Sequence, residues 1–219
     1  VDLGLSLGAL LTDLSKAFDC LPLYLLVAKL HAYGFNINAA KLIYDYLTNR
    51  KQRTKIGNKI IPFEDIKYGV PQGSILGPFL FNIYLCDLFF AMETYDIASY
   101  ADDTTPYVFG ENNDSVIQSL EDCSVMLFKW FRDNQMQGNP DKCHVLMSSK
   151  TKENINVNVI LIESSLSEKL LGINIDNGLN FDKHISNICG KARAKVSALS
   201  RIASFLSMKK RILLMNAFF

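Results

Sequence analysis

The stretch "YADDTTPYV", Tyr100 to Val108, places two adjacent aspartates between an apolar run and a threonine pair. The flanking segments "DIASYA" and "TTPYVFG" have the residue types of β-strands, which predicts that the pair lies at the tip of a hairpin. Asp is common at such tips because its side chain hydrogen-bonds to the local backbone. Two interpretations are open at this point. Asp102 and Asp103 either close a polar turn or form a carboxylate pair that holds metal.

A third aspartate ends another predicted strand. The segment "LGALLTD", residues 7–13, reads as a buried strand that finishes at Asp13. Taken alone, such an Asp commonly caps the next helix. In an antiparallel sheet its strand end can lie beside Asp102, and three carboxylates would then repel one another unless a cation neutralises them. Oxygen ligands of this kind suit Mg²⁺, and two such ions can support an in-line phosphoryl transfer.

The rest of the pattern predicts an α+β fold with mostly antiparallel strands and helices on one face. Asp19 is expected to cap the first of these helices. We expect helices from Pro22 to Gly34, after an N-cap at Asn38, up to about Met92, over 116–130 and from about Asp182 onward. We expect further strands in a hairpin that turns at Gly57-Asn58, in "KCHVLMSS", and in "NVNVILI" and "EKLLGINI" as one pair, before a turn at Asn177-Gly178.

Composition favours a folded protein inside a cell. The 219 residues are 49% hydrophobic and 21% charged, which is enough for a packed core. The longest apolar run is broken by Pro78, Asn82 and Asp87, so a membrane span is not expected. Five cysteines without a C-x-x-C pair favour reduced, intracellular thiols over disulfides or zinc. Because the first strand begins almost at residue 1, we expect the chain to be a fragment.

The charge distribution is uneven although the net charge is only +1. From Lys183 onward there are eight Lys/Arg and no Asp/Glu, which leaves 15 basic and 22 acidic residues before that point. A basic tail of this kind can attract a polyanion such as a nucleic-acid backbone. The alternative is an ordinary solvated helix face.

Five segments occur in the order, and at about the spacing, of the palm motifs of reverse transcriptases, and they most resemble those of non-LTR (LINE-type) retrotransposons. They are "LLTDLSKAFDCLP", "GVPQGSILGPFLFNIYLCDL", "YADD", "NQMQGNPDKCHVL" and "EKLLGINIDNGLNFDKHI". The resemblance implies a right-hand polymerase palm, part of the fingers and the start of a helical thumb. Residues 1–182 would be the palm, with partial fingers at about 22–68, and residues 183–219 the basic thumb helices.

The resemblance also implies an activity and the residues for it. The reaction would be RNA-directed DNA synthesis, in which a primer 3′-hydroxyl attacks the α-phosphate of a dNTP on an RNA template. Asp13, Asp102 and Asp103 resemble the triad that holds two Mg²⁺ ions, with Mn²⁺ as a substitute. Lys142 matches the lysine that protonates the departing pyrophosphate, although a surface lysine is the alternative. Phe18 matches the aromatic gate against a 2′-hydroxyl, and the alternative is a core phenylalanine.

Three other segments are similar to nucleic-acid contacts of the family. Gln72 and Gly73 in "PQG" would lie against the incoming nucleotide, and a simple turn before a helix is the alternative. Residues Lys169, Leu170, Leu171 and Gly172 form "KLLG", which resembles the hairpin that grips the primer strand. The basic segment "NRKQRTKIGN" resembles the finger side near the template, or is only a charged hairpin.

The chain departs from a complete enzyme of this family, because the N-terminal fingers and possibly an endonuclease domain are missing. We therefore expect weak or no polymerase activity from residues 1–219 alone. The alternative function is a non-catalytic or decayed retroelement-derived nucleic-acid-binding domain, which a Mg²⁺-dependent primer-extension assay would separate from a polymerase. A phosphatase with Asp13 as nucleophile is excluded, because such enzymes need a second Asp where Ser15 stands.

Overall fold

The computed structural model describes residues 4–149 and 151–218, and the chain divides into two compact units at Ser165/Leu166. Each unit is described by itself. The elements of the first unit are β1 (Ser6–Leu11), α1 (Ala17–Cys20), α2 (Leu23–Ala32), α3 (Ile37–Leu47), β2 (Arg50–Gln52), β3 (Lys55–Ile56), β4 (Lys59–Ile60), β5 (Glu64–Ile66), α4 (Leu76–Ala91), β6 (Asp96–Tyr100), β7 (Asp103–Gly110), α5 (Asn113–Asp133), η1 (Pro140–Lys142), β8 (His144–Met147), β9 (Asn154–Val157) and β10 (Ile160–Glu163).

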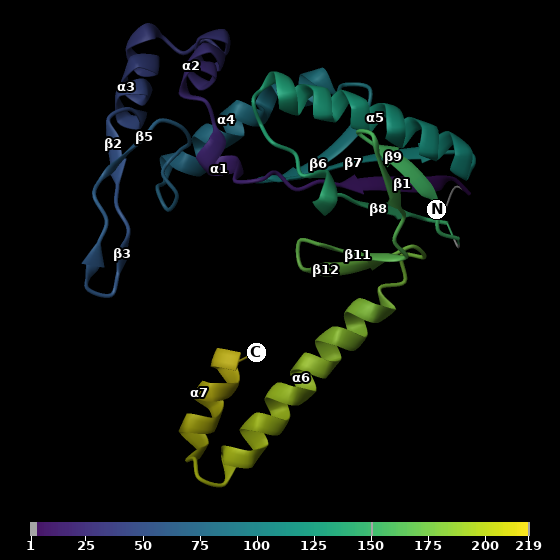
Figure 1. Cartoon of the computed structure of the whole chain (residues 1–219). Helices are drawn as coiled ribbons and strands as arrows, with labels where there is room; N and C mark the ends of the chain where they lie inside the picture. Colours follow the sequence, from purple (N-terminus) through teal and green to yellow (C-terminus); the bar gives the residue numbers. More distant parts are fainter. Residues whose placement is uncertain (1–3, 150, 219) are drawn as a thin grey trace. The chain divides into compact units, whose positions relative to one another are not determined.

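The central sheet of the first unit has the strand order β6-β7-β1-β8, and all three pairings are antiparallel (Figure 1). β6 and β7 form the predicted hairpin, with Tyr100 paired to Asp103 and only Ala101 and Asp102 between them. β1 lies between two strands that come more than ninety residues later in the chain. The α+β class with antiparallel strands is therefore confirmed.

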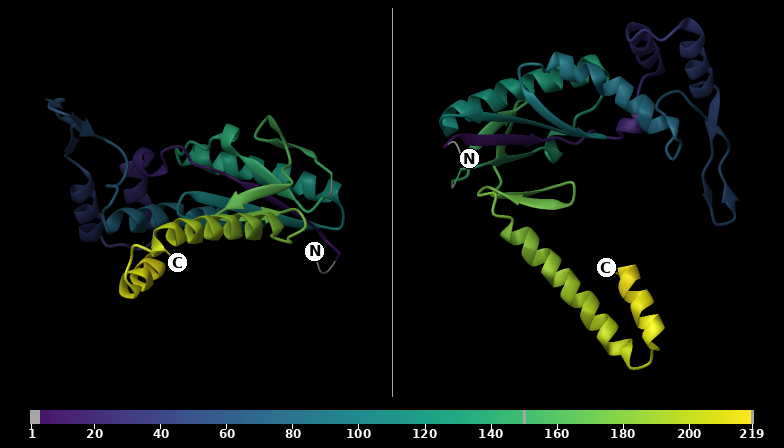
Figure 2. Two further views of the ribbon diagram at one scale, coloured as in Figure 1. Left: turned by 90° about the horizontal axis from the view of Figure 1, so that it is seen from below. Right: turned by 180° about the vertical axis from the view of Figure 1, so that it is seen from behind.

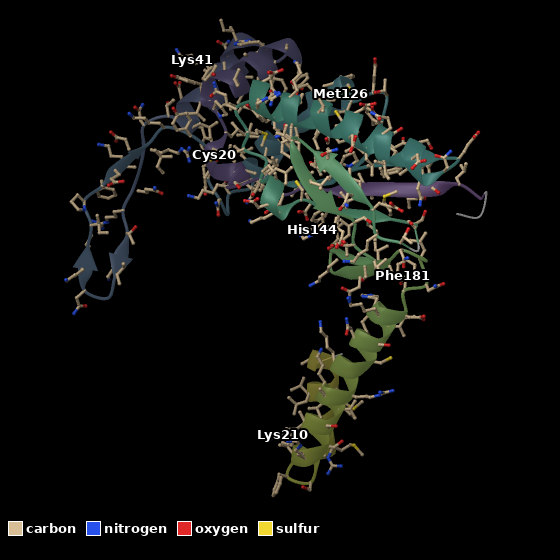
Figure 3. All side chains as sticks on the ribbon, turned by 45° about the vertical axis from the view of Figure 1, so that its right-hand side comes forward. Cys20, Lys41, Met126, His144, Phe181 and Lys210 are labelled. Carbon is tan, nitrogen blue, oxygen red and sulfur yellow. The ribbon has the colours of Figure 1, made fainter. Side chains whose placement is uncertain are left out.

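Helix α5 covers one face of this sheet. Its buried side chains recur at helical spacing, which gives the helix one apolar face. The helix lies very close to β1, because a Cβ added to Gly8 would lie 2.5 Å from Val116 and 2.7 Å from Leu120. In Figure 3, Met126 marks α5 on one side of the sheet, and His144 on β8 lies on the other side. Within the first unit, α5 thus leaves the other face of the sheet open.

Helices α2 and α3 and a long hairpin lie at one end of the first unit (Figure 2). The Lys29 ammonium fastens α2 to α4, because it donates to the Asp87 carboxylate over 2.7 Å and to the Tyr84 carbonyl over 2.8 Å. The predicted N-cap of α3 was wrong by two residues. Asn36 is the cap and accepts from the Ala39 amide over 2.8 Å. Beyond α3, β3 and β4 turn at Gly57-Asn58 as predicted.

The predicted pairing of "NVNVILI" with "EKLLGINI" was wrong, because each segment belongs to its own hairpin. β9 pairs with β10 around Asn158-Val159. The second hairpin joins β11 (Ser167–Leu170) to β12 (Ile173–Asp176) around Leu171-Gly172. All four turn residues have positive φ, as tight two-residue turns of this type require.

The second unit contains the β11–β12 hairpin and two helices, α6 (Asp182–Ala203) and α7 (Met208–Phe218). The predicted turn after β12 is present. The Asp176 carboxylate accepts from the amides of Gly178 and Asn180 over 3.1 and 2.9 Å and from that of Phe181 over 2.6 Å. The compact units divide before β11 rather than at residue 182, and the division into palm and thumb stays a prediction. None of the helices in the described ranges has the length and apolar character of a transmembrane span.

Candidate active site

The strand pairing brings Asp13 opposite Asp103 at one end of the sheet. The pairing of the two chain segments continues past the end of β1. The Thr12 amide and hydroxyl both donate to the Thr104 carbonyl, over 3.1 and 2.7 Å. If this register is continued by one residue, Asp13 comes opposite Asp103, in agreement with the effect of the Asp13 charge on the Asp103 carboxyl. Thr12 and Thr104 are buried whereas the two aspartates are half-buried. Because side chains alternate between faces, both carboxylates lie on the face that α5 leaves open.

Lys142 lies beside Asp13, on the neighbouring segment, and the three residues Lys142, Asp13 and Asp103 are together called the row. The single turn of η1 follows the Asn139 cap, whose side chain accepts from the Asp141 amide. The same turn is held to β1, because the Asn139 amide donates to the Asp13 carbonyl over 3.1 Å. The Lys142 ammonium then donates to the Asp13 carboxylate over 2.8 Å. The structure therefore gathers Lys142, Asp13 and Asp103 across three adjacent segments.

Asp102 occupies the tight turn beside this row. Its neighbour Ala101 has a φ of 54°, a conformation that is unusual for a residue with a side chain. Lys16, which lies between Asp13 and α1, also has a positive φ of 51°. Such outliers persist only where the surrounding structure enforces them, and they concentrate at functional sites. Both turns that lead away from the carboxylates are strained in this way.

The electrostatic effect of this arrangement is seen at Asp103 and at Lys142. Burial raises the pKa of the Asp103 carboxyl above its ordinary value, and the charges of Asp102 and Asp13 raise it further. The ion pair with Asp13 raises the pKa of the Lys142 ammonium. Lys142 therefore stays protonated at neutral pH and supplies a positive charge next to an acidic cluster.

Phe18 lies on α1, five residues after Asp13. Its half-buried ring stacks on Phe81 of α4, with 4.4 Å between the ring centroids and 27° between the planes. Phe18 also lines a cavity of about 490 Å³ together with Pro78, Asn82, Leu85 and Phe89 of α4 and Ser99, Tyr100 and Ala101 of the hairpin. The ring is therefore both a packing residue and part of the wall of a cavity that borders the Asp102 turn.

The "PQG" loop is fastened to α1. The Gln72 carboxamide donates from Nε2 to the Asp19 carboxylate over 2.8 Å. Gly73 has a φ of 77°, and a Cβ added there would meet no atom within 4 Å, so the space beside its backbone is open. The prediction that Asp19 caps α2 was wrong, because the N-cap of α2 is Pro22 and makes no side-chain hydrogen bond. The Asp19 side chain instead accepts a hydrogen bond from Gln72, a loop residue more than fifty positions later in the chain.

Sequence reasoning missed a glycine of this loop and an arginine of β2 that binds the loop's backbone. Gly69 has a φ of 76°, and a Cβ there would lie 2.5 Å from the Phe18 carbonyl oxygen. Arg50 donates to the carbonyls of Tyr68 and Gly69 over 3.2 and 2.5 Å and to that of Leu47 over 2.8 Å. Gly69 precedes the "PQG" motif by only two residues, so its position was the available signal. Nothing in the sequence around Arg50 indicates its partners.

The remaining predicted residues belong to the second unit. Lys169, Leu170, Leu171 and Gly172 form the end of β11 and its turn in the second unit. In the described part of the chain, no group of three or more His, Cys, Asp or Glu side chains is arranged to hold a metal ion on its own. This does not conflict with Mg²⁺, which is usually held by one or two carboxylates together with substrate phosphates rather than by an all-protein cage.

Comparison with known proteins gives the family of the chain. Residues 3–175 match the model of the family described as reverse transcriptase (RNA-dependent DNA polymerase). The chain is 28% identical over 169 residues to the RNA-directed DNA polymerase from mobile element jockey of Drosophila melanogaster, covering 73% of this chain and 18% of that protein. It is also 28% identical to a Pol polyprotein from the type-1 retrotransposable element R1 of Bradysia coprophila, over 87% of this chain and 19% of the relative.

The fold has solved counterparts. A structure of apo telomerase from Candida tropicalis, truncated from its C-terminal domain, matches with a TM-score of 0.56 and 15% identity over 81% of this chain and 35% of that chain. At this identity the likeness concerns the fold, which is the polymerase palm. The chain spans less than a quarter of the curated relatives named above. With a family match over most of its length, and with relatives from non-LTR retrotransposons as predicted, the chain belongs to the reverse transcriptase family.

Proposed function

We propose that this chain carries the nucleotidyl transfer of an RNA-directed DNA polymerase, in which a primer 3′-hydroxyl attacks the α-phosphate of a dNTP and pyrophosphate leaves. The observation that supports this most directly is the row of Lys142, Asp13 and Asp103 on the open face of the sheet, with Asp102 in the adjoining turn. An RNA template and a DNA primer are the proposed partners. The Lys169–Gly172 turn and the basic helices α6 and α7 would contact them.

The carboxylates fit a divalent ion in their chemistry. Members of this family generally use divalent metals, and oxygen donors with a net negative charge are what Mg²⁺ prefers. Two Mg²⁺ ions, or Mn²⁺ in their place, would stabilise the charge on the attacking and leaving oxygens. Asp13 and Asp102 would hold them, with Asp103 as the less direct partner. The pKa of Asp103 is raised first by burial and then by the charges of Asp102 and Asp13, and a bound cation would offset the second of these effects.

The remaining residues act on the substrate. The Phe18 ring would occupy the space that a 2′-hydroxyl needs, and its stacking on Phe81 supports this by keeping the ring in place. A steric device is required here because an apolar pocket discriminates poorly against an added hydroxyl. Lys142 would transfer its proton to the departing pyrophosphate. Its ammonium carries that proton at neutral pH, and its hydrogen bond to Asp13 keeps it beside the carboxylates. Gln72 would hydrogen-bond to the nucleotide.

The test is the Asp102→Asn variant of the full-length protein. We expect Mg²⁺-dependent primer extension on an RNA template to fall by more than about 100-fold, because even residues that only support a metal ligand cost 10- to 100-fold. Binding to a primer–template duplex should stay nearly unchanged. Asp96→Asn is the matched control, because Asp96 is exposed at the other end of the same hairpin and should leave extension intact.

Two results would contradict the proposal. Extension at the wild-type rate by Asp102→Asn would remove the metal role of this residue. Duplex binding by the wild-type protein without any Mg²⁺-dependent extension would favour the alternative, a non-catalytic nucleic-acid-binding domain. The basic residues from Lys183 onward are consistent with that alternative, so the extension assay decides between the two.

A further inference from the structure

The Asp19–Gln72 hydrogen bond has no role in the function proposed above, and yet it lies between the two elements that would surround the nucleotide. Asp19 follows Phe18 directly on α1, and Gln72 lies in the loop before α4. The carboxylate accepts from Gln72 Nε2 over 2.8 Å. Asp19 makes no cap for α2, so capping does not account for its orientation.

The backbone that carries these two side chains is braced on both sides. The Gly69 amide donates to the Leu21 carbonyl and the Val70 amide to the Phe18 carbonyl, each over 2.8 Å. Gly69 is in such close contact with α1 that an added Cβ would lie 2.7 Å from Asp19 Cα. The loop and α1 are therefore held together by backbone contacts. This backbone arrangement places the Asp19 and Gln72 side chains within hydrogen-bonding distance of each other.

The chemistry of the pair determines which way the carboxamide of Gln72 faces. An ionised carboxylate only accepts hydrogen bonds, whereas a carboxamide has a donor end and an acceptor end. Asp19 can therefore engage only the Nε2 end, and the Oε1 end of Gln72 must turn away from Asp19. What Gln72 offers to a ligand is then an oxygen acceptor, which matches a hydroxyl donor. Next to the Phe18 gate, that donor would be a sugar hydroxyl.

We propose that Asp19 is a positioning residue that orients the Gln72 carboxamide, so that its Oε1 accepts from the 3′-hydroxyl of the incoming nucleotide. This inference rests on the proposed function for the identity of the ligand. Without Asp19 the carboxamide can rotate and present its donor end instead. The preference for a nucleotide with a 3′-hydroxyl over its 2′,3′-dideoxy analogue should then weaken. Loss of one typical hydrogen bond should lower that preference about 2- to 13-fold.

The experiment measures kcat/KM for dTTP and ddTTP incorporation by the full-length protein. Asp19→Ala should lower the dTTP/ddTTP ratio through KM for dTTP. Asp19→Asn should lower it too, but less, because an asparagine can still accept from Gln72 Nε2 but can also donate to Oε1 and so no longer enforces one orientation. Adding Asp19→Ala to Gln72→Ala should change nothing further, because residues that act as a unit are not additive. Glu93→Ala is the control, since this exposed carboxylate lies beyond the far end of α4, roughly 24 Å along the helix.

The outcomes separate this inference from the proposed function. If Asp19→Ala slows both nucleotides equally and leaves their ratio unchanged, or if its effect adds to that of Gln72→Ala, the inference is wrong while the polymerase proposal stands. If the wild-type protein extends no primer, the polymerase proposal fails. Equilibrium binding of dTTP and ddTTP by the full-length protein then gives the ratio of the two dissociation constants, in which the same hydrogen bond should appear without any chemistry. A wild-type protein that binds the two nucleotides equally, or an Asp19→Ala protein with an unchanged ratio of dissociation constants, would again overturn the role of Asp19.

Discussion

Replacing Gly69 with Ala should destabilise the first unit by more than the conformational cost of an alanine at a positive φ. Gly69 has a φ of 76°, and an alanine in this left-handed region costs about 1–2 kcal/mol. The added Cβ would also lie 2.5 Å from the Phe18 carbonyl oxygen and 2.7 Å from the Asp19 Cα and carbonyl oxygen. These are backbone atoms, which cannot rotate away as the end of a flexible side chain can.

Relief of this clash requires α1 and the loop to move apart. The hydrogen bonds from Gly69 to Leu21 and from Val70 to Phe18 would then weaken. Overpacking of this kind typically costs about 1–3 kcal/mol. We therefore expect Gly69→Ala to lower the free energy of unfolding by about 2–5 kcal/mol, the sum of the conformational and packing costs.

Gly34 provides the matched control. Its φ is 85°, but a Cβ added there meets no atom within 4 Å, so Gly34→Ala should cost only the conformational part, about 1–2 kcal/mol. Urea denaturation can be followed by the fluorescence of Trp130, the single tryptophan, which is only 6% exposed. Equal shifts of the urea midpoint in the two variants, with equal m-values, would show that the close contact at Gly69 adds nothing to the conformational cost and would refute the reasoning.

Two further predictions concern other residues of the first unit. Phe18→Val should raise the ratio of ribonucleotide to deoxyribonucleotide incorporation by at least about 10-fold in a primer-extension assay of the full-length protein. An unchanged ratio would show that Phe18 is only a packing residue. Burial raises the pKa of the Cys123 thiol from 9.0 to about 12, so the unfolded chain ionises first and stability is lost as the pH rises from 9 to 12. Cys123→Ala should reduce that slope by about 1.4 kcal/mol per pH unit in urea titrations, and an identical slope in the variant would contradict the assignment.

Local chemistry made much of the fold predictable. The hairpin at Asp102-Asp103, the turn at Gly57-Asn58 and helix α5 follow from residue types that favour one conformation wherever they occur. The cap of α3 was harder, because Asn36 and Asn38 are both suitable cap residues. Both lie before the same apolar face, so the pattern does not distinguish between them.

The misassigned strands show where local patterns stop being informative. The segments around β9 to β12 have the composition of strands, and the elements themselves are present. Which strand pairs with which depends on whether the chain can reverse within two residues. The turns at Asn158-Val159 and Leu171-Gly172 do so with positive φ at both positions, although three of these four residues are not glycine. Val159 in particular belongs to a class that rarely adopts this conformation.

For the candidate site, the sequence by itself determined the chemical groups and the order in which they occur. It placed Asp102 and Asp103 at the tip of a hairpin and Asp13 near a strand end, because short-range preferences suffice for that. The turn itself is one residue earlier than predicted, since it consists of Ala101 and Asp102 and Asp103 already begins β7. Only the tertiary structure decided which groups meet. Lys142 reaches Asp13 across 129 positions of the chain, and Asp19 binds Gln72 across 53. These contacts depend on β1 lying between β7 and β8 and on the close approach of Gly69 to α1. Such long-range packing is a property of the whole fold and leaves no mark on the residues around each group.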